Sequence, residues 1–283
     1  MDLCDRKDIQ SLLARHGFHF AKSLGQNFLI RGDVAEAIAD AGCIPGCGVL
    51  EVGPGIGALT VQLARRAEKV VSVELDKRLP PVLAETMAGY GNFTLIEGDV
   101  MKLSLAAVAA EQLQGLEPVL CANLPYNITT PFLTECVRAG CFRQLTVLIQ
   151  KEVAQRICAR PGTGEYGAFT VLMQYYTEPE LLFEVPNTCF MPPPKVTSAV
   201  VRCVTRRERP VQVVSEEAFW RTVRAGFALR RKTLVNSLQT GWQLPKERLA
   251  GIVESCGLPP TVRGEALGLE EYARLADALA AAE

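Results

Sequence analysis

The chain has 283 residues, of which 48% are hydrophobic and 22% are charged, and its formal net charge is −1. This composition is typical of a soluble globular protein with about two domains. Because no apolar run approaches the roughly 20 residues of a membrane-spanning helix and the first residues are too charged for a signal peptide, we expect a cytoplasmic protein that does not enter a membrane.

The ten cysteines are scattered along the chain and contain no Cys-x-x-Cys pair. The two histidines, His16 and His19, lie far in sequence from most of them. Scattered cysteines in such a chain are usually small buried hydrophobic residues. We therefore predict neither a disulfide framework nor a metal site.

Short β-branched runs alternate with helical stretches between about residues 33 and 150. The predicted strands are Val49–Val52, Val70–Glu74, Thr94–Glu97, Val119–Ala122 and Leu145–Gln150. The predicted helices between them are Ala58–Ala67, Lys77–Ala88, Leu105–Leu113 and Pro131–Ala139. This alternation predicts an α/β fold with a doubly wound, mainly parallel, Rossmann-like sheet that is covered on both faces. Asp33 is expected to cap a helix that ends at Gly42.

Beyond residue 150 the pattern changes from mixed to helical. Helices are predicted at Lys151–Ala159 and Ala168–Tyr176, and strands at Leu181–Val185 and Ser198–Val204. The remaining predicted elements are the helices Glu216–Gln239, Lys246–Cys256 and Leu269–Ala282. The composition shifts near Thr205–Pro210, so we predict an α/β domain over residues 1–208 and a smaller all-helical domain over residues 209–283.

Positive charge is concentrated between Lys195 and Lys232, where ten basic residues face three acidic ones. Four of these basic residues recur on one side of the predicted helix Glu216–Gln239. They are Arg221, Arg224, Arg231 and Lys232. Such a run is often only a solvated face, but a positive stripe on a nearly neutral protein also suits phosphate binding.

A glycine-rich loop, Glu51-Val52-Gly53-Pro54-Gly55-Ile56-Gly57, lies between the first strand and the first long helix of the sheet. Glycines allow a tight turn and a close approach of a ligand to the backbone, and ligands of doubly wound sheets bind where the strands end. The loop therefore predicts a nucleotide site. Glu74 stands about 20 residues further on, where an acid would hold ribose hydroxyls. NAD and S-adenosylmethionine both carry such a ribose, so the loop alone leaves both open.

The tetrapeptide Asn123-Leu124-Pro125-Tyr126 follows the fourth predicted strand. Asn and Pro are ordinary turn residues, but this turn also suits methylation of an adenine amine, whose lone pair is delocalised into the ring. The Asn123 side-chain oxygen and the Leu124 carbonyl would accept the amino hydrogens, and Tyr126 would stack on a base that has left its helix. Because hydride transfer gives no reason for such a turn, this tetrapeptide favours S-adenosylmethionine over NAD.

Four blocks together resemble the ribosomal RNA adenine N6,N6-dimethyltransferases of the KsgA (RsmA) type. They are Gly25-Gln26-Asn27-Phe28-Leu29, Glu51 to Gly57, Asn123 to Ile128, and Phe190-Met191-Pro192-Pro193-Pro194-Lys195-Val196-Thr197-Ser198. The resemblance extends from about Gly25 to Leu238, and the four blocks are specific only in combination. Leu124 and the block from Phe227 to Leu234 resemble the small-subunit enzymes rather than the antibiotic-resistance enzymes that modify large-subunit RNA.

The resemblance implies transfer of methyl groups from S-adenosylmethionine to N6 of two adjacent adenosines near the 3′ end of small-subunit ribosomal RNA, during ribosome biogenesis. The residues implied for cofactor binding are Asn27, Leu29, Gly53, Glu74, Asp99 and Asn123. Those implied around the target adenine are Asn123, Leu124, Tyr126 and Phe190. Two of them also have simpler interpretations, since Asp99 could cap a turn and Phe190 could be a core aromatic. The helical domain is expected to bind RNA phosphates, and the protein is expected to be a monomer.

Two alternatives remain open. One is an adenine N6-methyltransferase that acts on large-subunit RNA or on DNA and shares the tetrapeptide. The other is a ribosome-assembly factor that binds RNA and whose methylation is incidental.

Overall fold

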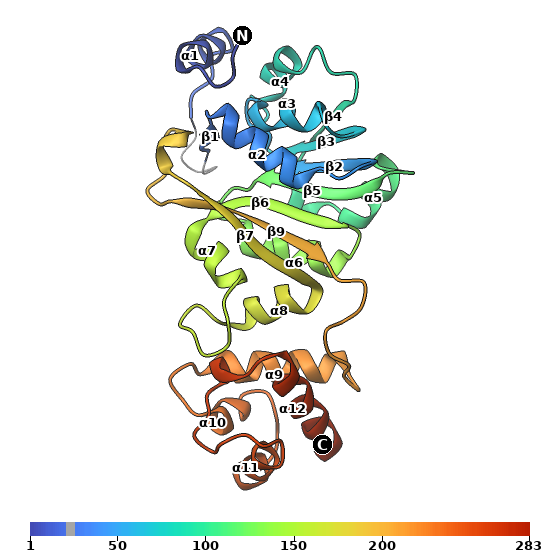
Figure 1. The fold of residues 1–283 in the computed structure, drawn as a ribbon, viewed down its shortest axis with the longest axis vertical. Helices are drawn as coiled ribbons and strands as arrows, with labels where there is room; N and C mark the ends of the chain where they lie inside the picture. Colours follow the sequence, from blue (N-terminus) through green and yellow to red (C-terminus); the bar gives the residue numbers. More distant parts are fainter. Residues whose placement is uncertain (21–25) are drawn as a thin grey trace. The chain divides into compact units, whose positions relative to one another are not determined.

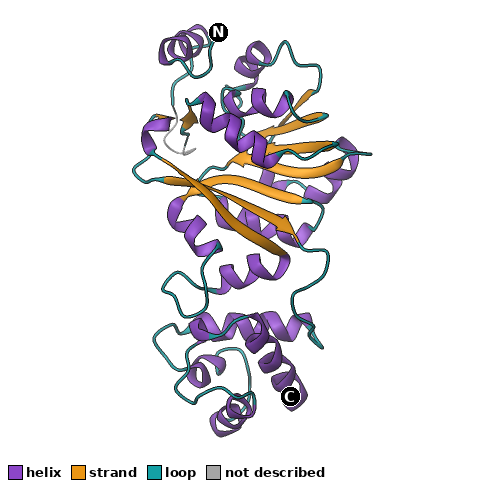
Figure 2. Cartoon of the chain, in the orientation of Figure 1, coloured by secondary structure: helices purple, strands orange, loops and turns teal. Residues whose placement is uncertain are grey.

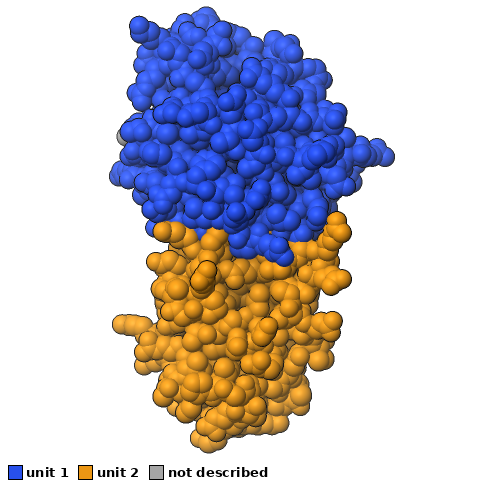
Figure 3. Space-filling model, in the orientation of Figure 1, with its two compact units in different colours: residues 1–154, 178–205 blue, residues 155–177, 206–283 orange. Residues whose placement is uncertain are grey.

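The computed structural model describes residues 1–20 and 26–283. These residues form two compact units, one of residues 1–154 and 178–205, the other of residues 155–177 and 206–283 (Figure 3). The second unit is thus discontinuous in sequence, because it includes a helical stretch that precedes the last strands of the sheet. The functional division between residues 1–208 and 209–283 stays a prediction.

The first unit is built on a seven-stranded sheet with the strand order β4-β3-β2-β5-β6-β9-β7 (Figure 1). In that order the strands are β4 (Phe93–Glu97), β3 (Lys69–Glu74), β2 (Cys47–Val52), β5 (Glu117–Asn123), β6 (Gln144–Gln150), β9 (Ser198–Thr205) and β7 (Thr177–Val185). The strands from β4 to β6 are parallel, and β9 runs antiparallel to β6. The predicted doubly wound, mainly parallel sheet is confirmed, and each predicted strand lies within an observed one.

Helices lie on both sides of this sheet (Figure 2). Those of the first part of the chain are α1 (Arg6–Arg15), α2 (Gly32–Gly42), α3 (Ala58–Ala64), α4 (Pro80–Thr86), α5 (Leu105–Gln112), α6 (Thr129–Ala139) and α7 (Lys151–Ile157). Because both faces are covered, all six residues of β2 are buried, as expected for a central parallel strand. Among the described residues, no helix is long and apolar enough to cross a membrane.

The predicted capping role of Asp33 is wrong. Helix α2 begins at Gly32, its N-cap is Arg31, and no described side chain caps it. Asp33 lies in the first turn, where its carboxylate accepts hydrogen bonds from the Arg31 side chain. An acid in the first turn of a helix interacts favourably with the helix dipole. Asp33 can therefore stabilise the start of α2 as a residue of its first turn, although it is not the N-cap.

A second, two-stranded sheet joins the first and the last of the four sequence blocks. Strand β1 (Phe28–Leu29) runs antiparallel to β8 (Phe190–Met191), with Leu29 opposite Phe190. Both residues are buried in the same hydrophobic core. This pairing holds the N-terminal block of the sequence against the proline-rich block about 160 residues later.

The second unit is helical and has its own aromatic core. Its helices are α8 (Ala168–Tyr176), α9 (Glu216–Ala228), α10 (Leu234–Leu238), α11 (Lys246–Ser255) and α12 (Leu269–Ala282). Helix α9 packs against α8, α10 and α12, and the rings of Tyr175 and Phe219 stack 5.1 Å apart. The Tyr272 hydroxyl donates a hydrogen bond to the Gly264 carbonyl at 3.0 Å, which fixes the short 3-10 helix Gly264–Ala266 against α12.

The predicted extent of the helix Glu216–Gln239 is wrong, because α9 ends at Ala228. The side chain of Ser237, on α10, forms hydrogen bonds with backbone groups that would otherwise bond within the next helical turn. Its hydroxyl donates to the Ala225 carbonyl at 2.7 Å and accepts a hydrogen bond from the Leu229 amide at 3.0 Å. A contact between groups 8 to 12 residues apart thus ends the helix, although neither proline nor glycine stands between Ala228 and α10.

The predicted basic stripe on this helix is therefore also wrong. Arg231 and Lys232 lie beyond the end of α9, in the turn before α10. Arg221 is engaged elsewhere: its guanidinium pairs with Glu283 through two hydrogen bonds of 2.8 and 2.9 Å and lies 4.1 Å from the centre of the Trp242 ring. Arg224 remains as an exposed basic residue of the helix itself.

Substitution of Gly264 by Ala should destabilise the second unit. A Cβ at Gly264 would overlap the Gly226 carbonyl oxygen and approach the Tyr272 hydroxyl to 2.9 Å, and the backbone cannot yield as a flexible side chain would. We expect Gly264→Ala to lower the free energy of unfolding by about 1–3 kcal/mol. The matched control is Gly251→Ala, because Gly251 is a glycine of helix α11 with open space around it. That change should raise the stability by roughly 0.5–1 kcal/mol, and equal effects of the two substitutions in urea unfolding would contradict the prediction.

Candidate functional site

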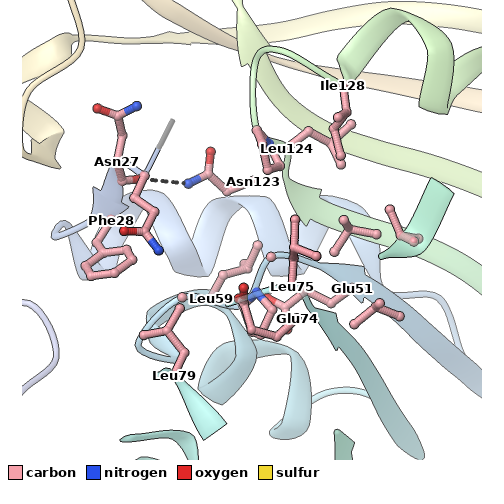
Figure 4. Close-up of a pocket in the computed structure, with 18 of the residues that line it drawn as sticks. Asn27, Phe28, Glu51, Leu59, Glu74, Leu75, Leu79, Asn123, Leu124 and Ile128 are labelled. Carbon is pink, nitrogen blue, oxygen red and sulfur yellow. Dashed lines mark hydrogen bonds between the residues drawn. The ribbon is translucent and has the colours of Figure 1, made fainter. Parts of the chain in front are cut away.

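A pocket opens where β2, β3, β4 and β5 end, at the carboxyl edge of the sheet (Figure 4). Eight of the nine site residues expected from the sequence line it: Asn27, Leu29, Gly53, Glu74, Asp99, Asn123, Leu124 and Tyr126. These residues come from five separate segments of the chain. The ninth, Phe190, does not line the pocket, and Gly25 of the N-terminal block lies outside the described residues.

The glycine loop forms one wall of this pocket. Gly53, Gly55 and Gly57 have φ angles of +67°, +59° and +94°, which side chains with a Cβ rarely adopt. A Cβ on Gly55 would also lie 2.9 Å from the Phe28 ring. The loop is therefore packed closely against the N-terminal segment, and Gly53 and Gly55 line the pocket without a side chain of their own.

Two carboxylates mark the other walls. Glu74 ends β3 and is buried, and its carboxylate accepts a hydrogen bond of 2.8 Å from the Asp76 amide. Burial raises the pKa of Glu74 above its ordinary value. Asp99 follows β4 and caps the 3-10 helix Val100–Lys102 by accepting from the Met101 amide at 3.0 Å. A carboxylate has further lone pairs, so the capping role leaves Asp99 able to accept a ligand hydrogen bond as well.

The Asn123 amide is held in one orientation. Its Nδ2 donates to the backbone carbonyl of Asn27 at 3.2 Å (Figure 4). A carbonyl oxygen only accepts hydrogen bonds, so the amide must present its nitrogen to Asn27 and its oxygen away from Asn27. The next residue is fixed too, since the Leu124 amide donates to the Leu148 carbonyl at 3.1 Å. The turn thus offers a preset acceptor at the pocket.

The two aromatic residues expected around a target base differ in their surroundings. Tyr126 lines the pocket and its hydroxyl shares a 2.7 Å hydrogen bond with Ser198. Burial raises the pKa of Tyr126 above its ordinary value. Phe190 is fully buried opposite Leu29, so its interpretation as a core aromatic agrees with the structure, and its stacking role stays a prediction.

Glu51 was given no role of its own on sequence grounds, although it lines the pocket. It is almost completely buried, and its carboxyl accepts a hydrogen bond of 2.6 Å from the Ser72 hydroxyl. Burial raises the pKa of Glu51 from 4.5 to about 7, with a further contribution from the nearby Glu74. The signal that could have found it is a carboxylate inside an otherwise apolar strand. Two buried acids in one pocket favour a cationic ligand.

The described residues contain no group of His, Cys, Asp and Glu side chains arranged to hold a metal ion. The polar groups of the residues that line the pocket are carboxylates, amides, the Tyr126 phenol and the backbone of the glycine loop. Such a site can position a cationic nucleoside ligand and accept hydrogen bonds from an amine beside it.

Comparison with known proteins gives a consistent result. The sequence profile described as "Ribosomal RNA adenine dimethylase" matches residues 17–280. The "Ribosomal RNA small subunit methyltransferase A" of Geobacillus thermodenitrificans (strain NG80-2) is 48% identical over 278 residues, covering 95% of this chain and 94% of that protein.

Two solved structures are also similar. The 23S rRNA methyltransferase ErmE is 28% identical with a TM-score of 0.69, covering 90% of this chain and 100% of that one. A dimethyladenosine transferase from Plasmodium falciparum has a TM-score of 0.73 at 23% identity, covering 88% of this chain and 95% of that one. The second similarity concerns the fold alone.

The burial of Glu51 predicts a pH dependence of stability. A carboxyl with a raised pKa in the folded state stabilises the protein below its unfolded pKa, and this stabilisation is lost as the pH rises through the folded value. The contribution of Glu51 to the free energy of unfolding should therefore fall between about pH 4.5 and pH 7, and Glu51→Gln, which cannot ionise, should reduce the fall of stability across this range. Urea unfolding across this range measures it. The exposed Glu36→Gln serves as the control, and an unchanged slope in Glu51→Gln would refute the prediction.

Proposed function

Because the chain belongs to the ribosomal RNA adenine dimethylase family, we propose that it methylates N6 of two adjacent adenosines in the 3′-terminal hairpin loop of small-subunit ribosomal RNA. The enzyme is an S-adenosylmethionine-dependent methyltransferase. The small-subunit substrate is supported by the printed name of the relative that is 48% identical over nearly the whole chain. The proposed setting is ribosome biogenesis in the cytoplasm, with the protein acting as a monomer.

The pocket at the carboxyl edge of the sheet fits S-adenosylmethionine. When bound, this cofactor supplies an electrophilic methyl group on a positively charged sulfur. We propose that Glu74 binds the ribose hydroxyls and Asp99 the adenine amino group, with Gly53, Asn27 and Leu29 lining the remainder. The glycine loop that lines the pocket and the two buried acids support a cationic nucleoside ligand.

The observation that carries the proposed chemistry is the fixed orientation of the Asn123 amide. With Nδ2 engaged by the Asn27 carbonyl, Oδ1 remains as an acceptor for a hydrogen of the target amine. We propose that the Leu124 carbonyl accepts the second hydrogen. Two acceptors would draw the nitrogen from its planar, delocalised state toward a pyramidal and more nucleophilic one. The amine proton leaves to water after transfer, so catalysis rests on alignment and preset acceptors.

We propose that Tyr126 stacks on the target adenine after the base has left the RNA stack. The hydrogen bond between its hydroxyl and the Ser198 hydroxyl supports this role, because it holds the ring in place before a base arrives. Phe190 is proposed as the opposite face of the sandwich. Since its ring is buried in the structure, this part of the proposal requires the segment around Phe190 to shift when RNA binds.

Replacing Asn123 with Ala should abolish methyl transfer. The variant loses the acceptor for the amine but keeps Glu74, Asp99 and the glycine loop, so the dissociation constant for S-adenosylmethionine should change by less than about tenfold. Removal of one preset acceptor typically costs a factor of roughly 10²–10³ in rate. Transfer of tritiated methyl groups to unmethylated small subunits measures activity, calorimetry measures cofactor binding, and circular dichroism confirms folding. Turnover equal to that of the wild type would remove Asn123 from the mechanism.

The same assay separates the alternative functions. Wild-type protein should label small subunits, and mass spectrometry of the RNA should find N6,N6-dimethyladenosine in the hairpin loop. Label in large-subunit RNA or duplex DNA instead would overturn the proposed substrate while leaving the methyltransferase assignment. If Asn123→Ala fully restored ribosome assembly in a strain that lacks the gene, the assembly role would outweigh methylation.

We propose that the basic residues around the end of α9 bind RNA phosphates. Reversing Arg224, Arg231 and Lys232 to Glu should weaken RNA binding and reduce the slope of log K against log salt by up to about 2–3, since each lost phosphate contact removes roughly 0.7–0.9. The matched control reverses three residues of the same unit that are also exposed and lie outside the basic run, namely Lys246, Arg248 and Arg274. Equal slopes in the two triple variants would identify the run as a solvated face.

A further inference from the structure

Asp76 is a buried carboxylate that the proposed mechanism does not use. It lies two residues after Glu74 and is 6% exposed. Its oxygens accept hydrogen bonds from Arg78 Nε at 2.8 Å, Arg78 Nη2 at 2.6 Å and Gln26 Nε2 at 2.7 Å. The hydrogen bonds from Arg78 are the main reason that the pKa of Asp76 lies below its ordinary value. The group is therefore a carboxylate that joins the turn after β3 to the N-terminal segment.

Arg78 extends this connection. While two of its nitrogens bind Asp76, Nη1 donates to the His19 carbonyl at 2.8 Å, and its guanidinium lies 4.8 Å from the centre of the Phe18 ring. A guanidinium can bind several partners in this way because its fork presents fixed donors in different directions. The Asp76–Arg78 pair consequently holds the chain both at His19 and at Gln26.

The segment held in this way leads directly to the reacting groups. Gln26 precedes Asn27, whose carbonyl orients the Asn123 amide at 3.2 Å. A second route runs through aromatic rings. The ring centres of Phe18 and Phe28 lie 5.8 Å apart, and the Phe28 ring packs against Gly55 of the glycine loop. Both routes begin at the Asp76–Arg78 pair and end at groups that line the pocket.

We propose that Asp76 and Arg78 are positioning residues, which hold Gln26 and Phe18 so that the N-terminal segment forms its wall of the cofactor pocket and presents the Asn27 carbonyl to Asn123. This inference rests on the proposed function. It assigns different tasks to two acids on one turn: Glu74 faces the pocket, and Asp76 fixes the chain that forms another wall. In this proposal Gln26 positions the neighbouring Asn27 and does not itself contact the reacting atoms.

Substitutions at positions 26 and 76 test the proposal. Gln26→Glu places a second carboxylate against Asp76, where the two repel, and should lower kcat about tenfold or more and weaken S-adenosylmethionine binding, because a small displacement of aligned groups is costly. Asp76→Asn turns a donating amide nitrogen toward Arg78 or Gln26 and should cause losses in the same direction. An introduced carboxylate that acted directly on the cationic cofactor would instead strengthen cofactor binding. Tighter binding by Gln26→Glu, or wild-type kinetics of either variant, would therefore overturn the proposal.

Two further variants complete the experiment. Arg78→Lys keeps the charge but cannot bind Asp76 and the His19 carbonyl together, so it should lower kcat with little change in the unfolding midpoint. An unchanged kcat in this variant would count against the proposal. The control Asp40→Asn breaks an exposed ion pair with Arg66, outside the lining of the pocket, and should leave kcat unchanged. Calorimetric cofactor binding needs no RNA, so the variants at positions 26 and 76 test the proposal there even if the wild-type enzyme proves to methylate a different nucleic acid.

Discussion

The site depends on one constraint, which is that parallel strands bring their carboxyl ends to the same edge of a sheet. The glycine loop follows β2, Glu74 ends β3, Asp99 follows β4 and Asn123 ends β5. These groups are separated by up to about 70 residues in sequence, yet the register of four neighbouring strands places them around one pocket. A ligand that spans the pocket therefore contacts the ends of several strands at once, and ligand binding at this edge is the general behaviour of doubly wound folds.

Burial at this edge gives the pocket its electrostatic character. Glu51 and Glu74 both have a raised pKa because the surrounding chain excludes water. Asp76, by contrast, has a lowered pKa because Arg78 binds it. Three acids within one region thus differ according to their surroundings: the two whose charge is disfavoured by burial gain from a cationic ligand, whereas the third already pairs with a cation of the protein and serves to hold the chain together.

The sheet and most of the pocket could be predicted from the sequence because their signals are local. Apolar runs of strand length, the glycine loop and the tetrapeptide each report on a few neighbouring residues. Apart from the local error at Asp33, the features that were missed arise from distant contacts. The hydroxyl of Ser237 ends α9 from outside the helix, and the pairing of Leu29 with Phe190 involves two-residue strands, which are too short to show an alternating pattern. The connection of Asp76 to Gln26 spans 50 residues and leaves no periodic signal.

The choice of asparagine at position 123 follows from the same geometry. The Asn123 side chain donates on one side to the Asn27 carbonyl, and the proposed mechanism requires the same side chain to accept on the other side from the target amine. An aspartate would face the Asn27 carbonyl with a second acceptor, so it would be repelled or would need to bind a proton. A serine is too short to reach both partners. An amide satisfies both requirements without a net charge. The carboxylates of the pocket then remain the groups that would interact with the positive charge of the cofactor.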